Sequence, residues 1–344
     1  MDEQLDTRTY DLLRLVDRHG PIGSIRLVEL MDRRGYDIQD RTIRLTLADL
    51  DAKGFTEKVP GRGRRLTERG RHELEQGDVR GRLEEIRAKI ATLTSRVNYD
   101  PLEDSGELVA SSAILEEGAI EDALGVIERL HTLPFGPLPV GLERLDEDTV
   151  RLFAASSITL DGVLLSRGIN ADLSAASVLE YTTDLSAEED EPRRALAEYG
   201  GHLVRHVDVI DGEGSSIDVI SLLIEAGRGS VSPVLDGEST GLLVGDDRRF
   251  PIVRFEETRD LTIATRSNLG GVVDFQRPGE GLPAENGNAA WAYGSVTYVG
   301  AGELLIQALH ERGLLTDWEP LYGTVPRNRL SVVDAQSHLA PGAE

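Results

Sequence analysis

Nine basic residues lie between positions 41 and 71, and they are the first candidates for chemistry. Only four acidic residues oppose them there, so the local charge is +5, whereas the whole chain carries −24. A cationic cluster in an acidic chain is where a polyanion would bind. Together with a serine expected near them, the candidate nucleic-acid contacts are Ser24, Arg41, Thr42, Arg44, Leu45, Arg62, Arg64 and Arg65.

The elements that must position these side chains are three short helices and a hairpin. Apolar residues at helical spacing predict helices over 7–19, from Ser24 and from Asp40. Strand-like runs on both sides of Pro60-Gly61-Arg62-Gly63 predict a β-hairpin with a basic tip. This order of elements is typical of a winged helix-turn-helix.

A winged helix suggests a specific mechanism. Its third helix lies in the major groove, where Arg41 or Arg44 can pair with guanine and Thr42 can contact a base or a thymine methyl. The glycines of the hairpin tip would let the wing approach the DNA backbone closely. A winged helix that contacts protein instead of DNA is the alternative.

Two internal matches predict that the acidic remainder is duplicated. The segment Ala155–Leu164 aligns without a gap to Ala264–Val273, with four of ten positions identical. The strand-like runs Val207–Ile210 and Val296–Val299 each lead into a G-x-G, at Gly212–Gly214 and Gly300–Gly302, before an apolar helix. We therefore predict two related halves, about 99–226 and 227–318.

Small-molecule sites favour the interface between such halves. Polar turns would supply hydroxyls, amides and backbone N–H groups, and arginines would anchor a carboxylate or phosphate. The alternative is that these residues only cap strand–helix turns. The predicted ligand contacts are Ser156, Ser157, Thr159, Asp161, Arg167, Thr265, Arg266, Ser267 and Asn268.

Composition excludes several other chemistries. The chain contains no Cys, so disulfides, Cys-ligated metals and a thiolate nucleophile are ruled out. The pair His202 and His206 would ligate a metal only on a helix, and this stretch reads as a strand. No nucleophile elbow or P-loop is present. We expect neither an enzyme nor a metal or cofactor site.

The remaining composition points to a cytoplasmic protein, because no run of about 18 apolar residues could span a membrane and the N-terminus is acidic. Only three of the 37 basic residues are Lys, and the acidic excess is large. This balance predicts a protein of an extreme halophile, an archaeon. An acidic protein from a GC-rich genome is the alternative.

The predicted fold class is α/β (α+β), with an N-terminal winged helix-turn-helix followed by an internally duplicated α/β regulatory domain. Residues 1–96 carry 20 basic and 18 acidic side chains, a net charge of +2, so all of the net negative charge lies beyond them. We divide the chain into a winged helix (1–75), a linker helix (76–98), a regulatory domain (99–323) and a C-terminal tail (324–344).

Several of these segments resemble the NrpR family of archaeal nitrogen-regulation repressors. The resemblance covers about residues 7–323. It is carried by Arg33–Ile38, Arg41–Arg44, Leu50–Thr56, Gly63-Arg64, Leu66–Gly70, Ser157–Leu165, Gly168-Ile169 and Leu321-Tyr322-Gly323.

The resemblance implies a repressor that binds inverted-repeat operators near nitrogen-assimilation genes as a dimer. It also implies release by 2-oxoglutarate bound in the regulatory domain. The ligand residues above are chosen by their chemistry and not carried over from the family. The alternatives are a winged-helix regulator that senses another metabolite, and a winged-helix adaptor that binds protein.

Overall fold

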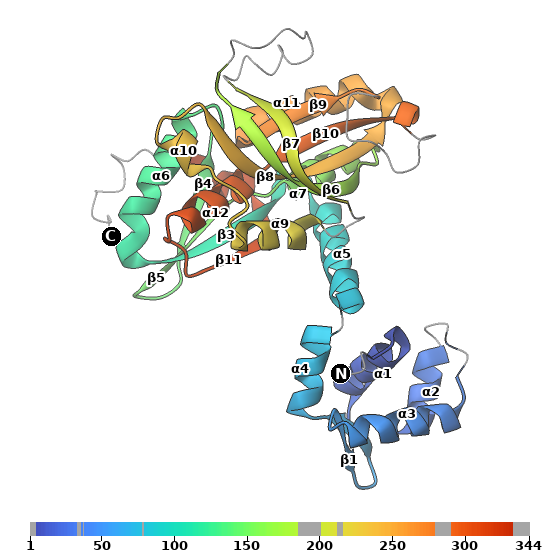
Figure 1. Cartoon of the computed structure of the whole chain (residues 1–344). Coiled ribbons are helices and arrows are strands. Elements are labelled where there is room, and N and C mark those ends of the chain that lie inside the picture. The colour runs from blue at the N-terminus through green and yellow to red at the C-terminus, as the bar shows by residue number, and fades with distance from the viewer. Residues whose placement is uncertain are drawn as a thin grey trace. The chain divides into compact units, whose positions relative to one another are not determined.

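The structure is a computed structural model of the whole chain. It describes residues 5–32, 36, 38–77, 79–184, 201–211, 216–278 and 290–332. Gly212-Glu213-Gly214, part of the Arg33–Ile38 motif and the end of the predicted tail lie outside the described residues. The chain forms two compact units, residues 1–86 and 87–344, within which the described residues are discussed separately (Figure 1).

The first unit is a winged helix, as predicted. Its elements are α1 (Thr7–His19), α2 (Ser24–Asp32), α3 (Asp40–Ala52), β1 (Thr56–Val59), β2 (Gly63–Leu66) and α4 (Glu68–Gly77). Apolar side chains from all three leading helices fill one core, which includes Leu13, Leu27 and Leu47.

The wing depends on a glycine. Gly63 has a φ of +112°, and a Cβ there would lie 2.1 Å from the carbonyl oxygen of Ile22. Ile22 bridges Arg64 with two backbone hydrogen bonds of 2.9 Å, so a third short segment lies beside the β1–β2 hairpin. Only glycine fits this close approach.

The second unit holds two five-stranded antiparallel sheets. The helix α5 (Val79–Arg96) precedes them, and the boundary between the units falls inside it. The elements of the first half are β3 (Glu107–Glu116), α6 (Ile120–Thr132), β4 (Pro139–Arg144), β5 (Thr149–Ala155), α7 (Ile158–Ser166) and β6 (Asp172–Thr182). Those of the second half are β8 (Thr240–Pro251), α11 (Phe255–Leu269), β9 (Val272–Gln276), β10 (Tyr293–Val299), α12 (Ala301–Glu311) and β11 (Asp317–Pro326).

Both halves have the order β-α-β-β-α-β, so the regulatory unit is duplicated. The first sheet has the order β11-β3-β5-β4-β12 and the second has the order β7-β6-β8-β10-β9. The last strand of each half therefore pairs with the first strand of the other half. The helices follow the same exchange, because α12 packs with α6 and α7 packs with α11. This exchange ties the halves together along two strand ladders.

The two internal alignments found in the sequence pair elements that do not correspond to each other in the fold. Ala155–Leu164 spans the end of β5 and α7, whereas Ala264–Val273 spans the end of α11 and β9. The element that corresponds to α7 is α12. The strand β7 (His202–Asp211) and the helix α9 (Ser216–Glu225) belong to a connection between the halves that also contains α10 (Ser232–Leu235).

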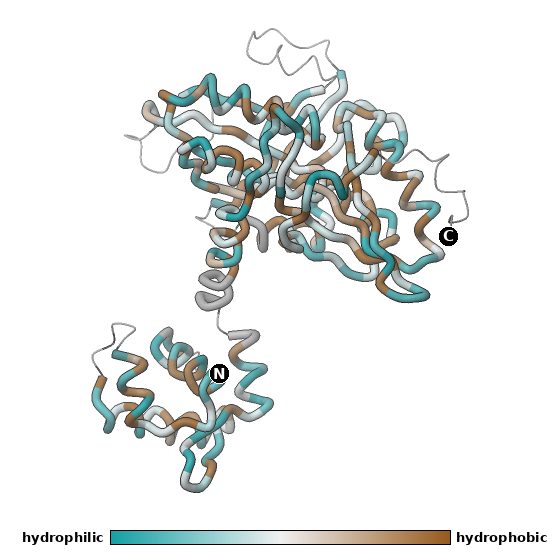
Figure 2. The backbone as a smooth tube through the Cα atoms, turned by 180° about the vertical axis from the view of Figure 1, so that it is seen from behind, coloured by the Kyte–Doolittle hydropathy of each residue, from teal (hydrophilic) through white to brown (hydrophobic). Residues whose placement is uncertain are grey.

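The regulatory unit also extends further than predicted. β11 continues to Pro326, and β12 (Ser331–Val332) pairs with β4 in the first sheet. Residues 324–332 are therefore part of the domain and not a tail. Figure 2 shows the apolar stretches of this unit concentrated along its inner strands and helices, where two large buried clusters form the core.

Candidate functional site

The N-terminal half of α3 presents an exposed surface in the winged-helix unit. Ile43, Leu47 and Leu50 are fully buried, which turns the predicted contact residues outward. Arg41 is exposed in the first turn, and the side chain of Leu45 is 65% exposed. An apolar side chain this exposed beside arginines suits contact with a thymine methyl.

The arginine of the second turn is held in place by its neighbours. Arg44 Nε donates to Ser24 Oγ at 3.2 Å, and an Arg44 nitrogen lies 2.7 Å from an Asp40 carboxylate oxygen. The structure therefore brings the predicted residues Ser24 and Arg44 together. The guanidinium remains 61% exposed, so it is oriented without being withdrawn from the surface.

The wing separates its three predicted arginines. Arg62 lies exposed at the tip, and Arg65 is 61% exposed with a 2.6 Å contact to Glu57. Arg64 is only 19% exposed, and its Nε donates to Asp51 Oδ2 at 2.9 Å. Arg64 thus fastens the wing to α3, a role that the sequence did not indicate.

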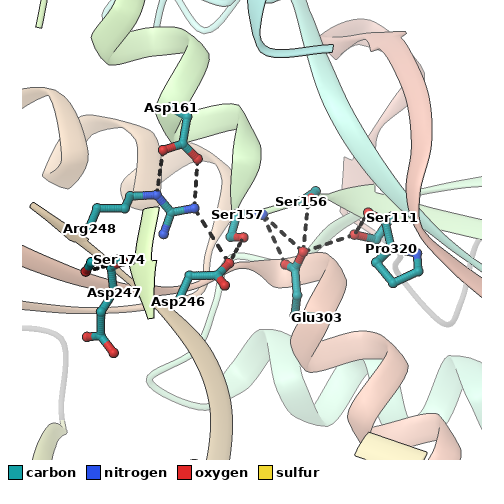
Figure 3. A network of polar contacts seen from close by, with 10 residues as sticks. All are labelled: Ser111, Ser156, Ser157, Asp161, Ser174, Asp246, Asp247, Arg248, Glu303 and Pro320. Atoms are coloured by element: carbon teal, nitrogen blue, oxygen red, sulfur yellow. Dashed lines mark hydrogen bonds and ion pairs between the residues drawn. The ribbon is translucent and has the colours of Figure 1, made fainter. Parts of the chain in front are cut away.

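A buried polar network joins the two halves of the regulatory unit where α7 and α12 begin (Figure 3). Ser156 Oγ donates to Glu303 Oε1 at 2.7 Å, and the Ser157 backbone N–H donates to Glu303 Oε2 at 3.1 Å. Ser111 Oγ, on β3, also lies 3.2 Å from Glu303 Oε1. A carboxylate of the second half therefore occupies the N-terminal end of a helix of the first half, where backbone N–H groups favour an anion.

The adjacent part of this network is an ion pair that also crosses between the halves. Arg248 on β8 donates from Nε and Nη2 to the two carboxylate oxygens of Asp161 on α7, both at 2.9 Å. Asp246 lies 3.6 Å from Arg248 and accepts a hydrogen bond from the Ser157 hydroxyl. The side chains of Arg248 and Asp246 are entirely buried.

Burial sets the protonation of this network. It raises the pKa of Asp246 to about 7, and Arg248 and the Ser157 hydroxyl oppose this only in part. Burial raises the pKa of Glu303 as well, against its hydrogen bond from Ser156. For Arg248, burial alone would lower the pKa, but the carboxylates of Asp161 and Asp246 outweigh it, and Arg248 stays a cation.

The predicted ligand residues fall into two groups. The first group lies in the buried polar network between the halves, which we call the seam, and consists of Ser156, Ser157, Thr159 and Asp161. There Thr159 Oγ1 donates to the Val109 carbonyl at 2.8 Å. Their polar atoms bond within the protein and do not line an open cleft.

The second group lies on and around α11 and is bonded elsewhere. Thr265 and Ser267 donate to backbone carbonyls four residues earlier. Arg266 donates to the Pro134 carbonyl, and Asn268 donates to the Pro101 carbonyl at 2.7 Å. Arg167, at the end of α7, forms an exposed ion pair of 3.0 Å with Asp100.

Sequence reasoning missed the charged partners of the seam. Arg248, Asp246 and Glu303 stand far from Ser157 and Asp161 in the sequence, and the strand exchange brings them together. The sequence offered one local signal, which is the Asp-Asp-Arg run at positions 246–248. Charged residues inside an otherwise apolar strand need buried partners. Within the described residues, no three His, Asp or Glu side chains are grouped to hold a metal, and no helix is long and apolar enough to cross a membrane.

Comparison with known proteins agrees with this architecture. The family model described as the ribonuclease R winged-helix domain matches residues 10–74, and the one described as NrpR regulatory domains NRD1 and 2 matches residues 83–188. The global nitrogen regulator NrpRI of Methanosarcina mazei is 26% identical over 93% of this chain and 96% of its own length.

Of two further comparisons, one is with a longer protein and one with a shorter solved structure. The global nitrogen regulator NrpR of Methanocaldococcus jannaschii is 26% identical over 72% of this chain but only 42% of its own length. The crystal structure of a nitrogen repressor-like protein from Methanococcus jannaschii covers 72% of this chain and 97% of its own, with a TM-score of 0.53 and 18% identity. The last comparison concerns the fold alone.

A winged helix with an exposed basic recognition surface, joined to a separate duplicated domain, defines the class of winged-helix transcription regulators. Within that class, the matched regulatory-domain model and the similarity along nearly the whole chain point to one group of relatives. The chain is similar to the NrpR nitrogen regulators, at 26% identity over 93% of its length.

Proposed function

We propose that this chain is a dimeric repressor of nitrogen-assimilation genes, that its winged helix binds inverted-repeat operators, and that 2-oxoglutarate releases it. The observation that carries the proposal is the exposed basic surface of α3 and the wing in a chain of net charge −24. The names of the related global nitrogen regulators support the choice of genes. The composition supports work in concentrated salt inside a halophile.

Binding in concentrated salt would depend on close contacts. At 1 M salt the Debye length is about 3 Å, so long-range attraction between arginines and phosphates is largely screened. Counterion release also contributes less as salt rises. Direct hydrogen bonds from Arg41 and Arg44 to base edges would therefore supply most of the specificity.

The first test is binding to an inverted-repeat fragment of a glutamine synthetase promoter, measured by fluorescence anisotropy in about 2 M KCl. Arg41→Ala should weaken specific binding by about 1–3 kcal/mol. Arg8→Ala is the control, because Arg8 is a 48% exposed arginine on α1, outside the basic cluster, the recognition helix and the wing. Unchanged operator affinity in Arg41→Ala and Arg44→Ala would contradict the assignment of the recognition helix.

We propose that one carboxylate of the effector binds at the start of α7. There the Ser156 hydroxyl and the Ser157 N–H bind the Glu303 carboxylate, so an incoming carboxylate would compete with Glu303 for the same donors. Because Glu303 lies on the other half, its release would loosen the contact between the halves. By linkage, operator DNA must weaken effector binding by the same factor as the effector weakens DNA binding.

Thermal unfolding with added 2-oxoglutarate tests this step. A ligand at about 100 times its dissociation constant adds about 2.7 kcal/mol of stability. Ser156→Ala should reduce that gain, whereas Ser166→Ala should not, because Ser166 lies at the opposite end of α7 and bonds to the Val163 carbonyl. A gain with another metabolite but not with 2-oxoglutarate would favour a different sensor of the same build. Absence of operator-specific binding at any salt would favour a protein-binding adaptor.

A further inference from the structure

One end of the second sheet carries large apolar side chains that the fold does not need. Val253, in the short helix η2 (Ile252–Arg254), is 86% exposed, and Trp291, in η3 (Ala290–Ala292), is 77% exposed. Tyr293 follows on β10 and is 40% exposed. Tyr293 pairs with Pro251 at the end of the β8–β10 ladder, and η2 and η3, which carry Val253 and Trp291, contact each other. We call these three residues the apolar end.

The duplication provides an internal comparison for the apolar end. In the first half, η1 (Glu117–Ala119) follows β3 as η2 follows β8, and Glu116 pairs with Thr149 as Pro251 pairs with Tyr293. In this register Gly118 stands where Val253 stands, and Glu147 stands where Trp291 stands. The same fold is therefore built without apolar side chains at these positions, so those of the second half serve another purpose.

The surroundings of the apolar end are electrically neutral. Arg254 pairs with Glu257 at 2.7 Å, and Arg259 pairs with Glu256 at 2.9 Å. Arg277 lies with its guanidinium 5.1 Å above the Phe255 ring and 3.9 Å from a Glu256 carboxylate oxygen, and Asp260 lies 3.3 Å from Arg259. The three arginines and three carboxylates of this region therefore balance. Two chains of net charge −24 repel each other where their surfaces are acidic, but the surroundings of the apolar end carry no net charge.

The apolar end contains both a protruding side chain and a hollow. A cavity of about 460 Å³ is lined by Ile252, Val253, Arg254, Phe255, Glu256, Glu257 and Arg277. Trp291 projects from the neighbouring η3. In a two-fold contact each residue meets a different residue of an identical partner, so a knob and a hole on one patch make it self-complementary.

We propose that the apolar end is the contact through which the regulatory units of two copies of this chain pair. In this contact Trp291 of each copy occupies the hollow beside Val253 of the other. The proposal deepens the dimer of the proposed function, because an inverted-repeat operator requires a two-fold axis, and its test does not depend on DNA. Buried apolar area, and not ion pairing, would hold the contact, so it would persist when salt screens charges.

Sedimentation of the full chain at about 10 µM, in 0.2 and 2 M KCl, measures the pairing. The wild type should sediment as a dimer, and Val253→Asp and Trp291→Ala should each raise its dissociation constant at least about tenfold, the effect of losing about 1.4 kcal/mol. Leu102→Asp is the control, because Leu102 is a 69% exposed apolar side chain elsewhere on the same unit. The circular dichroism spectrum should match the wild type in all three variants, since these side chains are exposed in the single chain.

A cross-link provides a second measurement. The chain has no natural Cys, so a single Val253→Cys or Leu102→Cys reports on one position. We expect a short bismaleimide to join two chains through position 253 and not through position 102. A monomeric wild type, or a dimer that Val253→Asp and Trp291→Ala leave intact, would overturn the proposal. A wild-type dimer that binds no operator would overturn the DNA-binding function and leave the interface standing.

Discussion

Removing the Asp161 carboxylate should destabilise the regulatory unit far more than removing an exposed carboxylate in a similar ion pair. The Arg248 side chain has no exposed surface, and its two hydrogen bonds of 2.9 Å both go to Asp161. Asp161→Ala leaves the buried guanidinium with Asp246, 3.6 Å away, as its ion-pair partner. Removing one member of a buried ion pair costs about 3–5 kcal/mol, because the other charge stays out of water.

The matched control is Asp208→Ala. Asp208 pairs with Arg228 at 3.1 Å, close to the distance in the buried pair, but the two side chains are 43% and 54% exposed. Exposed pairs contribute about 0–1 kcal/mol. Urea unfolding followed by circular dichroism and by the fluorescence of Trp291 and Trp318 gives both free energies. In thermal unfolding, a unit of this size should lose about 2–4 °C for each kcal/mol, so Asp161→Ala should melt about 6–20 °C lower.

A double variant separates the charge from the packing. Asp161→Leu combined with Arg248→Met replaces the ion pair by apolar side chains. It should be more stable than Asp161→Ala, because the guanidinium is removed together with its partner and the buried Asp246, without Arg248 to lower its pKa, stays protonated. If Asp161→Ala costs no more than Asp208→Ala, or if the double variant is less stable than the single one, the pair does not carry the energy assigned to it.

Three further outcomes follow from the structure. The pKa of Asp246 is raised above its unfolded value of 3.8 to about 7, so the wild-type unfolding free energy should fall as pH rises from about 4 to about 7. Urea unfolding at a series of pH values measures this slope, and Asp246→Asn should reduce it by about 1.4 kcal/mol per pH unit. Gly270→Ala should cost more stability than Gly168→Ala, because both have positive φ but only a Cβ at Gly270 would meet the Pro137 carbonyl oxygen, at 1.8 Å; equal melting temperatures would contradict this. Arg62→Ala should weaken binding to all DNA sequences alike and lower the slope of log affinity against log salt by about 1, whereas a sequence-dependent loss would give the wing tip a role in base reading.

Local pattern sufficed for the winged helix. Its helices are short amphipathic segments with clear starts and stops, and its hairpin carries glycines where the backbone requires them, as at Gly63. Local pattern misleads at α11, where Leu261–Ile263 is typical of a strand but lies in a helix. The Thr262 hydroxyl donates to the carbonyl of Thr258 in a buried helix, so it needs no partner outside the helix. Tertiary burial overrode the local preference of β-branched residues for strands.

The sequence by itself determined that a winged helix with a basic cluster precedes a separate acidic domain, because net charge, basic clustering and helical periodicity are properties of neighbouring residues. It also placed Ser156, Ser157 and Asp161 together, since they follow one strand and begin one helix. Only the tertiary structure decided their partners. Arg248 and Glu303 are 87 and 142 residues from Asp161 along the chain, and the exchange of a helix and a strand between the halves brings them into one buried network. A buried charge must be paired wherever the fold places it, and no local pattern specifies which distant residue will pair with it.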